Sequence, residues 1–308
     1  MIAVEGLTKV YGKRTALDAV SFEVPKGEIF GFVGPNGAGK TTTIRILAAL
    51  LDPTAGRAFI DGADVVEHPD RVHDRLGYMP DFFGVYDQLT AGEYLDFYAA
   101  CYRQPKARRS KIVQDLLELV GLSDRLNQSV DTLSRGMKQR LCLARALVHD
   151  PAVLLLDEPA SGLDPRARVE MREILKELQQ MGKTIVISSH ILPELTELCT
   201  MIGIIDQGQM RATGPVQDVI RKLTAGRRLR ISVLGKRDEA VAILKGLPSV
   251  TEVDVSNGSV EAGFEGDEAT AATILQALIA GGIQVSGFTQ LEGGLEAAFL
   301  RATKEAIG

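Results

Sequence analysis

The chain contains the glycine-rich run Gly34-Pro35-Asn36-Gly37-Ala38-Gly39-Lys40-Thr41. The apolar run Ile29-Phe30-Gly31-Phe32-Val33 precedes it and predicts a buried strand, and residues 42–51 follow it and predict a helix. A G-x-x-x-x-G-K-[ST] spacing between a strand and a helix is typical of a phosphate-binding loop. The alternative is a glycine-rich turn that merely precedes a lysine, and the flanking strand and helix argue against it.

Each residue type in this run contributes to phosphate binding in a definite physical way. Glycines allow successive backbone N–H groups to turn inward around an anion, and the N-terminus of the following helix adds its positive dipole end. Lys40 supplies a positive charge for the β- and γ-phosphates, and the Thr41 hydroxyl is a hard oxygen ligand for Mg²⁺. The run therefore predicts a site for a nucleoside triphosphate with Mg²⁺.

Length and composition limit the class of protein. The chain has 308 residues, which favours two domains, and its 45% hydrophobic and 24% charged residues are typical of a globular protein. A net charge of −5 argues against nucleic acid as a partner, because phosphate binding needs clustered Lys and Arg. One basic run, residues 106–111, is interpreted as a solvated helix start, with a DNA contact as the alternative.

Cysteine use and apolar runs indicate the compartment. Cys101, Cys142 and Cys199 lie far apart in the chain with no metal-ligand spacing, which fits reduced thiols in a cytoplasmic protein. The first residues carry an acid and no basic segment, so we expect no signal peptide. The apolar runs are too short to span a bilayer, so work at a membrane would require another chain to cross it.

Two carboxylates follow a second apolar strand, Val153-Leu154-Leu155-Leu156. Chemistry in open parallel sheets collects at the carboxyl ends of strands, so we expect Asp157 to face Mg²⁺ and Glu158 to polarise the attacking water. A helix N-cap is the alternative for paired acids after a strand, and the phosphate-binding loop upstream favours the functional interpretation. The strand over residues 183–189 delivers His190 to the same edge, where a γ-phosphate contact is expected.

Other single residues indicate a function less specifically than the motifs above. Tyr11 either stacks on a nucleotide base or is a half-buried strand tyrosine, and the local pattern leaves both open. The remaining histidines do not follow a predicted strand as His190 does, and they are interpreted as structural: His68, His73 and His149. Residues 90–149 carry helical periodicity and a capping box at Thr90, in a chain that otherwise alternates strands and helices.

A further stretch, Leu133-Ser134-Arg135-Gly136-Met137-Lys138-Gln139-Arg140, comes shortly before the acidic strand. Together with the phosphate-binding loop, the acidic strand and His190, it resembles the ATP-binding cassette (ABC) family of transporter ATPases over about residues 1–223. Several separate motifs occur in the right order. The resemblance implies an α/β fold, namely a P-loop NTPase core with an antiparallel β subdomain and a helical subdomain, here about residues 88–149.

The resemblance also implies roles for individual residues. The Walker A loop runs from Gly34 to Thr42, and the Walker B strand, residues 153–158, ends in Glu158 as the catalytic glutamate. His190 is the switch histidine, and the D-loop over residues 161–164 contains Asp164. Tyr11 is the adenine-stacking residue, and the implied cofactors are ATP and Mg²⁺.

Family members bind ATP between two cassettes, so the resemblance implies a homodimer or pairing with a second cassette. Ser134 and Gly136 would bind the γ-phosphate of ATP held by the other copy. A separate integral membrane permease is the implied partner, touched by the helical subdomain, and no nucleic acid is expected. The chain is expected in the cytoplasm, peripheral on the inner face of the cell membrane, where ATP hydrolysis powers transport through the permease.

Two other functions remain as alternatives. A soluble ABC-type ATPase could act on ribosomes or nucleic acid, but this chain has a single Walker A loop and residues 43–132 lack sustained heptads. A nucleotide-regulated protein that does not hydrolyse ATP is disfavoured by the presence of Glu158 and His190.

Two motifs depart from the family pattern, at three positions. Arg135 replaces a signature glycine and Met137 the usual glutamine, and Arg135 is expected either to add charge near the dimer interface or to point to solvent. Asp81 stands at the Q-loop glutamine position, where a carboxylate can reach Mg²⁺ through water. The subgroup with Asp here and an extra C-terminal domain resembles drug, sodium or polysaccharide exporters, so the expected direction of transport is export.

Residues 224–308 predict a second domain with the order βαββαβ, which favours a small α+β ferredoxin-like fold. A hairpin is expected around Asn257-Gly258, and a last helix over residues 295–300. This tail carries no catalytic constellation and is interpreted as an accessory, dimerisation or regulatory domain.

Overall fold

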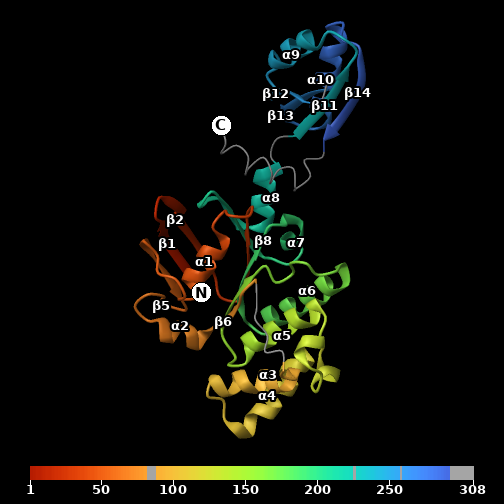
Figure 1. Ribbon diagram of the computed structural model, residues 1–308. Coiled ribbons are helices and arrows are strands. Elements are labelled where there is room, and N and C mark those ends of the chain that lie inside the picture. Colours follow the sequence, from red (N-terminus) through yellow and green to blue (C-terminus); the bar gives the residue numbers. More distant parts are fainter. Residues whose placement is uncertain (82–87, 225–226, 257–258, 292–308) are drawn as a thin grey trace. The chain divides into compact units, whose positions relative to one another are not determined.

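The computed structural model describes residues 1–81, 88–224, 227–256 and 259–291 (Figure 1). The chain divides into two compact units, Met1–Val216 and Gln217–Gly308, and each is described by itself. The predicted turn at Asn257-Gly258 and the predicted helix over residues 295–300 lie outside the described residues.

The first unit is built on a six-stranded sheet with the order β10-β9-β3-β8-β7-β6. Strand β3 (Ile29–Val33) pairs in parallel with β8 (Thr184–Ser189), which pairs in parallel with β7 (Val153–Asp157). All residues of these three strands are buried, because the sheet is covered on both faces, and this explains their continuous apolar runs. The outer strands are β6 (Leu76–Met79), β9 (Met201–Asp206) and the antiparallel edge strand β10 (Gln209–Pro215).

A second, antiparallel sheet of the same unit has the order β2-β1-β4-β5. Its strands are β1 (Ile2–Tyr11), β2 (Arg14–Val24), β4 (Ala55–Ile60) and β5 (Ala63–Asp64). Its core joins that of the central sheet through three rings, since Phe22 stacks on Phe30 with centroids 5.0 Å apart and lies 5.5 Å from Phe32. This is the predicted antiparallel subdomain.

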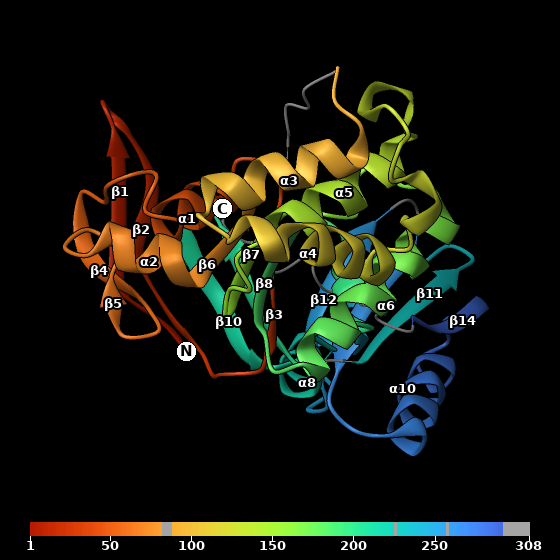
Figure 2. The ribbon, with the colours of Figure 1, turned by 90° about the horizontal axis from the view of Figure 1, so that it is seen from below.

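Helices flank these sheets (Figures 1 and 2). Those of the core are α1 (Lys40–Leu47), α2 (Pro69–Arg75), α6 (Pro165–Gln180) and α7 (Leu192–Thr196). Helix α8 (Val216–Thr224) begins at the last residue of the first unit, and its other residues belong to the second. Helix α2 was not predicted, because its seven residues bury only Val72 and give no helical periodicity.

The helical subdomain contains α3 (Ala91–Cys101), α4 (Lys106–Leu119) and α5 (Arg135–Leu147), with short 3-10 turns at Ser123–Arg125 and Val130–Thr132. Thr90 forms the predicted capping box with Glu93 at the start of α3. Lys106 and Arg108 are exposed on the first turn of α4, so the basic run is a solvated helix start, as interpreted from sequence.

The second unit contains a four-stranded antiparallel sheet with the order β12-β13-β11-β14. Its elements follow one another as β11 (Arg227–Val233), α9 (Arg237–Lys245), β12 (Val250–Ser256), β13 (Ser259–Phe264), α10 (Glu268–Ala280) and β14 (Val285–Leu291). This order and pairing are those of the ferredoxin-like fold, as the βαββαβ pattern predicted. Its core includes Leu229, Ile231, Leu244, Phe264 and Ile274.

Within the described part of the chain, no helix combines the length and the apolar character that crossing a bilayer requires. Cys101, Cys142 and Cys199 are all free thiols.

His149 has the structural position that the sequence suggested. Its Nε2 lies 3.1 Å from the carbonyl oxygen of Leu76, and its ring stacks on Tyr102 with centroids 3.8 Å apart. Burial lowers the pKa of His149 below that of an exposed histidine. Below the unfolded-state pKa of about 6.5, the unfolded chain therefore binds more protons at this position than the folded chain does.

We predict that His149→Gln makes stability less dependent on pH. In the native protein, the contribution of His149 to the stability of the folded state is fully present above the unfolded-state pKa. This contribution is lost as the pH falls from the unfolded-state pKa towards the lowered pKa of the folded state. Urea unfolding midpoints at about pH 7.5 and about pH 5.5 measure the effect, with the exposed His68→Gln as control. An equal pH dependence in native protein and His149→Gln would contradict the assignment.

Candidate functional site

Three parallel strands bring the predicted groups to one edge of the central sheet. The phosphate-binding loop follows β3, Glu158 follows β7 and His190 follows β8. A cavity of about 450 Å³ opens there. Its lining residues are Tyr11, Arg14, Ala16, Asn36, Gly37, Gly39, Lys40, Thr41, Thr42, Asp81, Glu158, Ser161 and His190.

The loop conformation depends on particular glycines. A Cβ on Gly34 would lie 2.2 Å from the carbonyl oxygen of Ile205, so no side chain fits without moving the backbone. Gly39 has a φ of 115° at the N-cap of α1, a conformation that glycine adopts without strain. Between them, the N–H of the buried Ala38 donates to the carbonyl of Pro35. The loop therefore closes tightly around the start of α1.

Lys40 is 7% exposed, and its Nζ donates to the carbonyls of Gly34 (2.8 Å) and Pro35 (3.3 Å). The same Nζ lies 3.5 Å from Oε1 of Glu158, which is 13% exposed. The Lys40 cation and the Glu158 carboxylate thus form a poorly solvated ion pair at the wall of the cavity.

One hydroxyl organises the acidic end of β7. Ser188 on β8 donates to Oδ1 of the buried Asp157 (2.6 Å) and accepts a hydrogen bond from the N–H of Glu158 (2.9 Å). Burial and the negative charge of Asp157 raise the pKa of Tyr78, so this phenol stays neutral beside the carboxylate. The Ser188 hydroxyl thus fixes the position of the Asp157 carboxylate at the end of the strand.

Glu158 and His190 form a pair. Nδ1 of His190 lies 2.9 Å from Oε2 of Glu158, and because a carboxylate only accepts, Nδ1 carries the proton. The backbone of Glu158 has a φ of 51°, a strained left-handed conformation for a residue with a side chain, which seven other described non-glycine residues also adopt. The His190 side chain is 44% exposed and lines the cavity.

The donor set fits a magnesium nucleotide. Hard oxygen donors are present in the Thr41 hydroxyl and in the carboxylates of Asp81 and Asp157. In the described residues, no group of three or more His, Cys, Asp or Glu could hold a metal ion by protein ligands alone. This agrees with Mg²⁺, which usually binds through one or two protein oxygens together with substrate phosphates and water.

The residues that line this cavity do not include six of the predicted nucleotide ligands, nor the predicted metal ligand Asp157. Gly34, Pro35 and Ala38 belong to the loop itself, and the other three are Ser134, Gly136 and Asp164. Ser134 is exposed and caps α5 by accepting from the N–H of Met137. Gly136 lies in the first turn of α5, next to Leu163, and Asp164 caps α6 by accepting from the N–H of Ala167 (2.9 Å). Within one chain these residues therefore have helix-capping and packing roles.

The structure adds residues that sequence reasoning missed. Arg14 lines the cavity beside Gly37, and no sequence signal distinguished it from other exposed strand residues. The sequence did contain an indication that Ser188 belongs to the site, because a polar residue near the carboxyl end of a buried strand is unusual. Arg135 lies against the D-loop, since a Cβ on Gly162 would be 2.5 Å from its guanidinium carbon. Arg135 is exposed to solvent, as one of the two expectations had it, and its guanidinium also lies against Gly162.

Comparisons with known proteins agree with this geometry. A family model described as ABC transporter matches residues 17–161. The linearmycin resistance ATP-binding protein LnrL of Bacillus subtilis (strain 168) is 33% identical over 309 residues, which cover 100% of this chain and 99% of that protein. The chain belongs to the ABC transporter ATP-binding proteins.

Other members of this family are also similar. The Nod factor export ATP-binding protein I of Ralstonia nicotianae is 40% identical over 71% of this chain and 68% of its own length. A solved ATP-binding subunit of an ABC transporter has a TM-score of 0.65 and 32% identity, covering 72% of this chain and 92% of that one. A dimeric cassette in a post-hydrolysis state with ADP and Pi has a TM-score of 0.64 and 26% identity, covering 70% and 99%.

These findings confirm the predicted family, the P-loop NTPase fold and the activity of an ABC ATPase. As an ATP-binding subunit of an ABC transporter, the chain binds and hydrolyses ATP. The roles of its individual residues are taken up below.

We predict that Gly34→Ala weakens ATP binding at least about tenfold and costs about 1–3 kcal/mol of stability, because the new methyl meets the Ile205 carbonyl. The shift would also move the carbonyl of Gly34, which holds Lys40. Nucleotide titration and thermal unfolding measure both effects. Gly246→Ala is the control, since a Cβ there makes ordinary contacts, and an unchanged ATP affinity in Gly34→Ala would contradict the prediction.

Proposed function

We propose that this chain is the ATP-hydrolysing subunit of an exporter, working as a pair of cassettes bound to a separate membrane permease at the inner face of the membrane. The contacts that link Lys40, Glu158 and His190 at the edge of the central sheet carry the proposal for the hydrolytic site. Export is supported by the names of relatives, which include a Nod factor export protein and a linearmycin resistance protein.

In the proposed site, Tyr11 stacks on the adenine, and the backbone N–H groups from Gly34 to Thr42 surround the phosphates with Lys40. Thr41, Asp157 and Asp81 would hold Mg²⁺, which neutralises phosphate charge when bound. The exposure of Tyr11 at the cavity rim and the burial of Asp157 at the end of β7 support these assignments.

Glu158 is the proposed group that orients the attacking water and accepts its proton. His190 holds the Glu158 carboxylate through Nδ1 and contacts the γ-phosphate side of the cavity. Lys40 stabilises the charge that develops on the phosphate oxygens, and its low exposure strengthens that interaction.

A second cassette would complete the site. Ser134 and Gly136 stand at the N-terminus of α5, where free backbone N–H groups and the helix dipole attract an anion, yet they do not line the cavity of their own chain. We infer that they and Asp164 of the D-loop meet ATP bound by the other copy. The dimeric cassette among the similar structures supports this arrangement.

We predict that Glu158→Gln lowers ATP turnover by about 10²–10⁴-fold while ATP binding persists, since Gln keeps the shape and loses the base. Steady-state phosphate release and nucleotide titration measure the two properties. The control is Glu177→Gln, an exposed position on α6. Near-normal turnover in Glu158→Gln would refute the proposed mechanism.

The helical subdomain offers a surface for the permease. A groove of about 410 Å³ lies between the core and this subdomain, with aromatic side chains from Tyr78, Tyr98 and Tyr102 and with Arg145. At its rim Leu50 is 58% exposed and Tyr102 is 40% exposed, which is unusual for large apolar side chains that lie together. We propose that an amphipathic segment of the permease docks here.

We predict that the tagged chain, purified from detergent-solubilised membranes, brings a stoichiometric multi-spanning membrane protein with it. Leu50→Asp should lower recovery of this partner at least about tenfold while ATP hydrolysis persists, because it places a charge in an apolar contact. Met181→Asp, an equally exposed apolar position at the end of α6, is the control. Recovery of ribosomes or DNA-repair proteins without a membrane protein would favour the soluble ATPase instead.

A further inference from the structure

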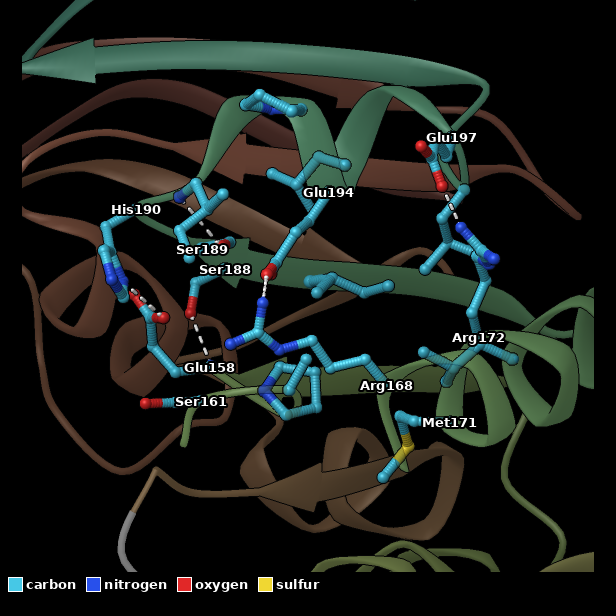
Figure 3. A pocket seen from close by; sticks show the side chains of 18 of the residues that line it. Glu158, Ser161, Arg168, Met171, Arg172, Ser188, Ser189, His190, Glu194 and Glu197 are labelled. Carbon is cyan, nitrogen blue, oxygen red and sulfur yellow. Dashed lines mark hydrogen bonds and ion pairs between the residues drawn. The ribbon is translucent and has the colours of Figure 1, made fainter. Parts of the chain in front are cut away.

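A second cavity, of about 400 Å³, lies on the other side of the Glu158–His190 pair (Figure 3). Its walls come from the loop after β7, from α6 and from α7. Apolar side chains of both helices, including Met171, Leu175 and Leu195, are buried at these walls.

Two ion pairs cross from α6 to α7 at this cavity (Figure 3). Nη1 of Arg168 lies 2.6 Å from Oε1 of Glu194, and Arg172 pairs with Glu197 one turn further along. The two pairs join the same helices and have the same chemistry.

Only one of the two arginines also holds the D-loop. Nε of Arg168 donates to the carbonyl of Leu163 (3.0 Å) while its Nη1 holds Glu194, so one planar guanidinium spans the D-loop and α7. Arg172, in contrast, forms ion pairs with the carboxylates of Glu173 and Glu197.

The D-loop and α7 each adjoin one member of the catalytic pair. The N–H of Ser161 donates to the carbonyl of Glu158 (3.0 Å), and Gln139 of α5 donates to the carbonyl of Ser161 (3.1 Å). On the other side, α7 begins two residues after His190. Arg168 thus connects the loop that follows Glu158 with the helix that follows His190.

We propose that Arg168 is a positioning residue that fixes the D-loop relative to α7 and thereby sets the contact between Glu158 and His190. This inference rests on the proposed roles of Glu158 and His190. By holding the carbonyl of Leu163 and the carboxylate of Glu194 at the same time, the Arg168 guanidinium links the D-loop directly to α7. Arg168 does not line the nucleotide cavity, so its effect falls on turnover and not on ATP affinity.

The test compares the two ion pairs in the full chain. Arg168→Gln should lower kcat for ATP hydrolysis at least about tenfold with KM unchanged, because small misplacements of catalytic groups cost large factors in rate. Arg172→Gln is the matched control and should change stability by a similar small amount while kcat stays near that of the native protein. Thermal unfolding of both variants checks that the folds are equally intact.

Charge reversal separates the ion pair from the D-loop contact. Arg168→Glu combined with Glu194→Arg restores opposite charges between α6 and α7 but removes the donor to Leu163, so we expect recovered thermal stability and a kcat that stays low. Arg172→Glu with Glu197→Arg should recover both properties. Full recovery of kcat in the first reversed pair, or an equal kcat in Arg168→Gln and Arg172→Gln, would overturn the proposal.

Turnover in Glu158→Gln tests the proposed hydrolytic site separately from the positioning role of Arg168. Normal turnover in Glu158→Gln would refute the proposed hydrolytic site itself. Lost turnover in Glu158→Gln, together with equal kcat values in the two arginine variants, would refute only the positioning role of Arg168.

Discussion

The parallel pairing of β3, β8 and β7 is the constraint on which the site depends. Val33 is paired with Ser189, and Asp157 with Ser188, so all three strands end at the same level of the sheet. The loop that follows each strand must therefore emerge at one edge. A shift of any strand by one residue would turn each of its side chains to the opposite face of the sheet and separate Lys40 from Glu158.

The charged groups at this edge of the sheet are poorly solvated, and this strengthens the interactions between them. Asp157 is 1% exposed and is held by a hydroxyl, while Glu158 is shared between Lys40 and His190. The left-handed backbone at Glu158 costs about 1–3 kcal/mol, which the hydrogen bond from its N–H to Ser188 helps to offset. Two neighbouring carboxylates of low exposure therefore stand at the end of β7, and we assign the chemistry to the second of them.

The D-loop is where several elements meet. Gln139 from α5 and Arg168 from α6 both hydrogen-bond its carbonyls, and Arg135 packs on Gly162. Gly162 has a φ of 68° and lacks the side chain that would collide with the Arg135 guanidinium. The replacement of a signature glycine by arginine is therefore accommodated by a glycine in the neighbouring loop, and the start of α5 is tied to the segment that follows Glu158.

Local patterns were enough to predict much of this protein, because their causes lie within a few neighbouring residues. Glycines around Lys40 determined the phosphate-binding loop, uninterrupted apolar runs determined the buried strands, and Thr90 and Ser134 marked helix starts through their own caps. The βαββαβ order of the second unit could also be predicted from the local sequence pattern. Tertiary structure alone decided the short helix α2, the position of Arg14 beside Gly37, and the contacts of Ser188, Arg135 and Arg168. Each of these contacts joins segments whose proximity depends on strand order and register, and no local periodicity encodes that proximity.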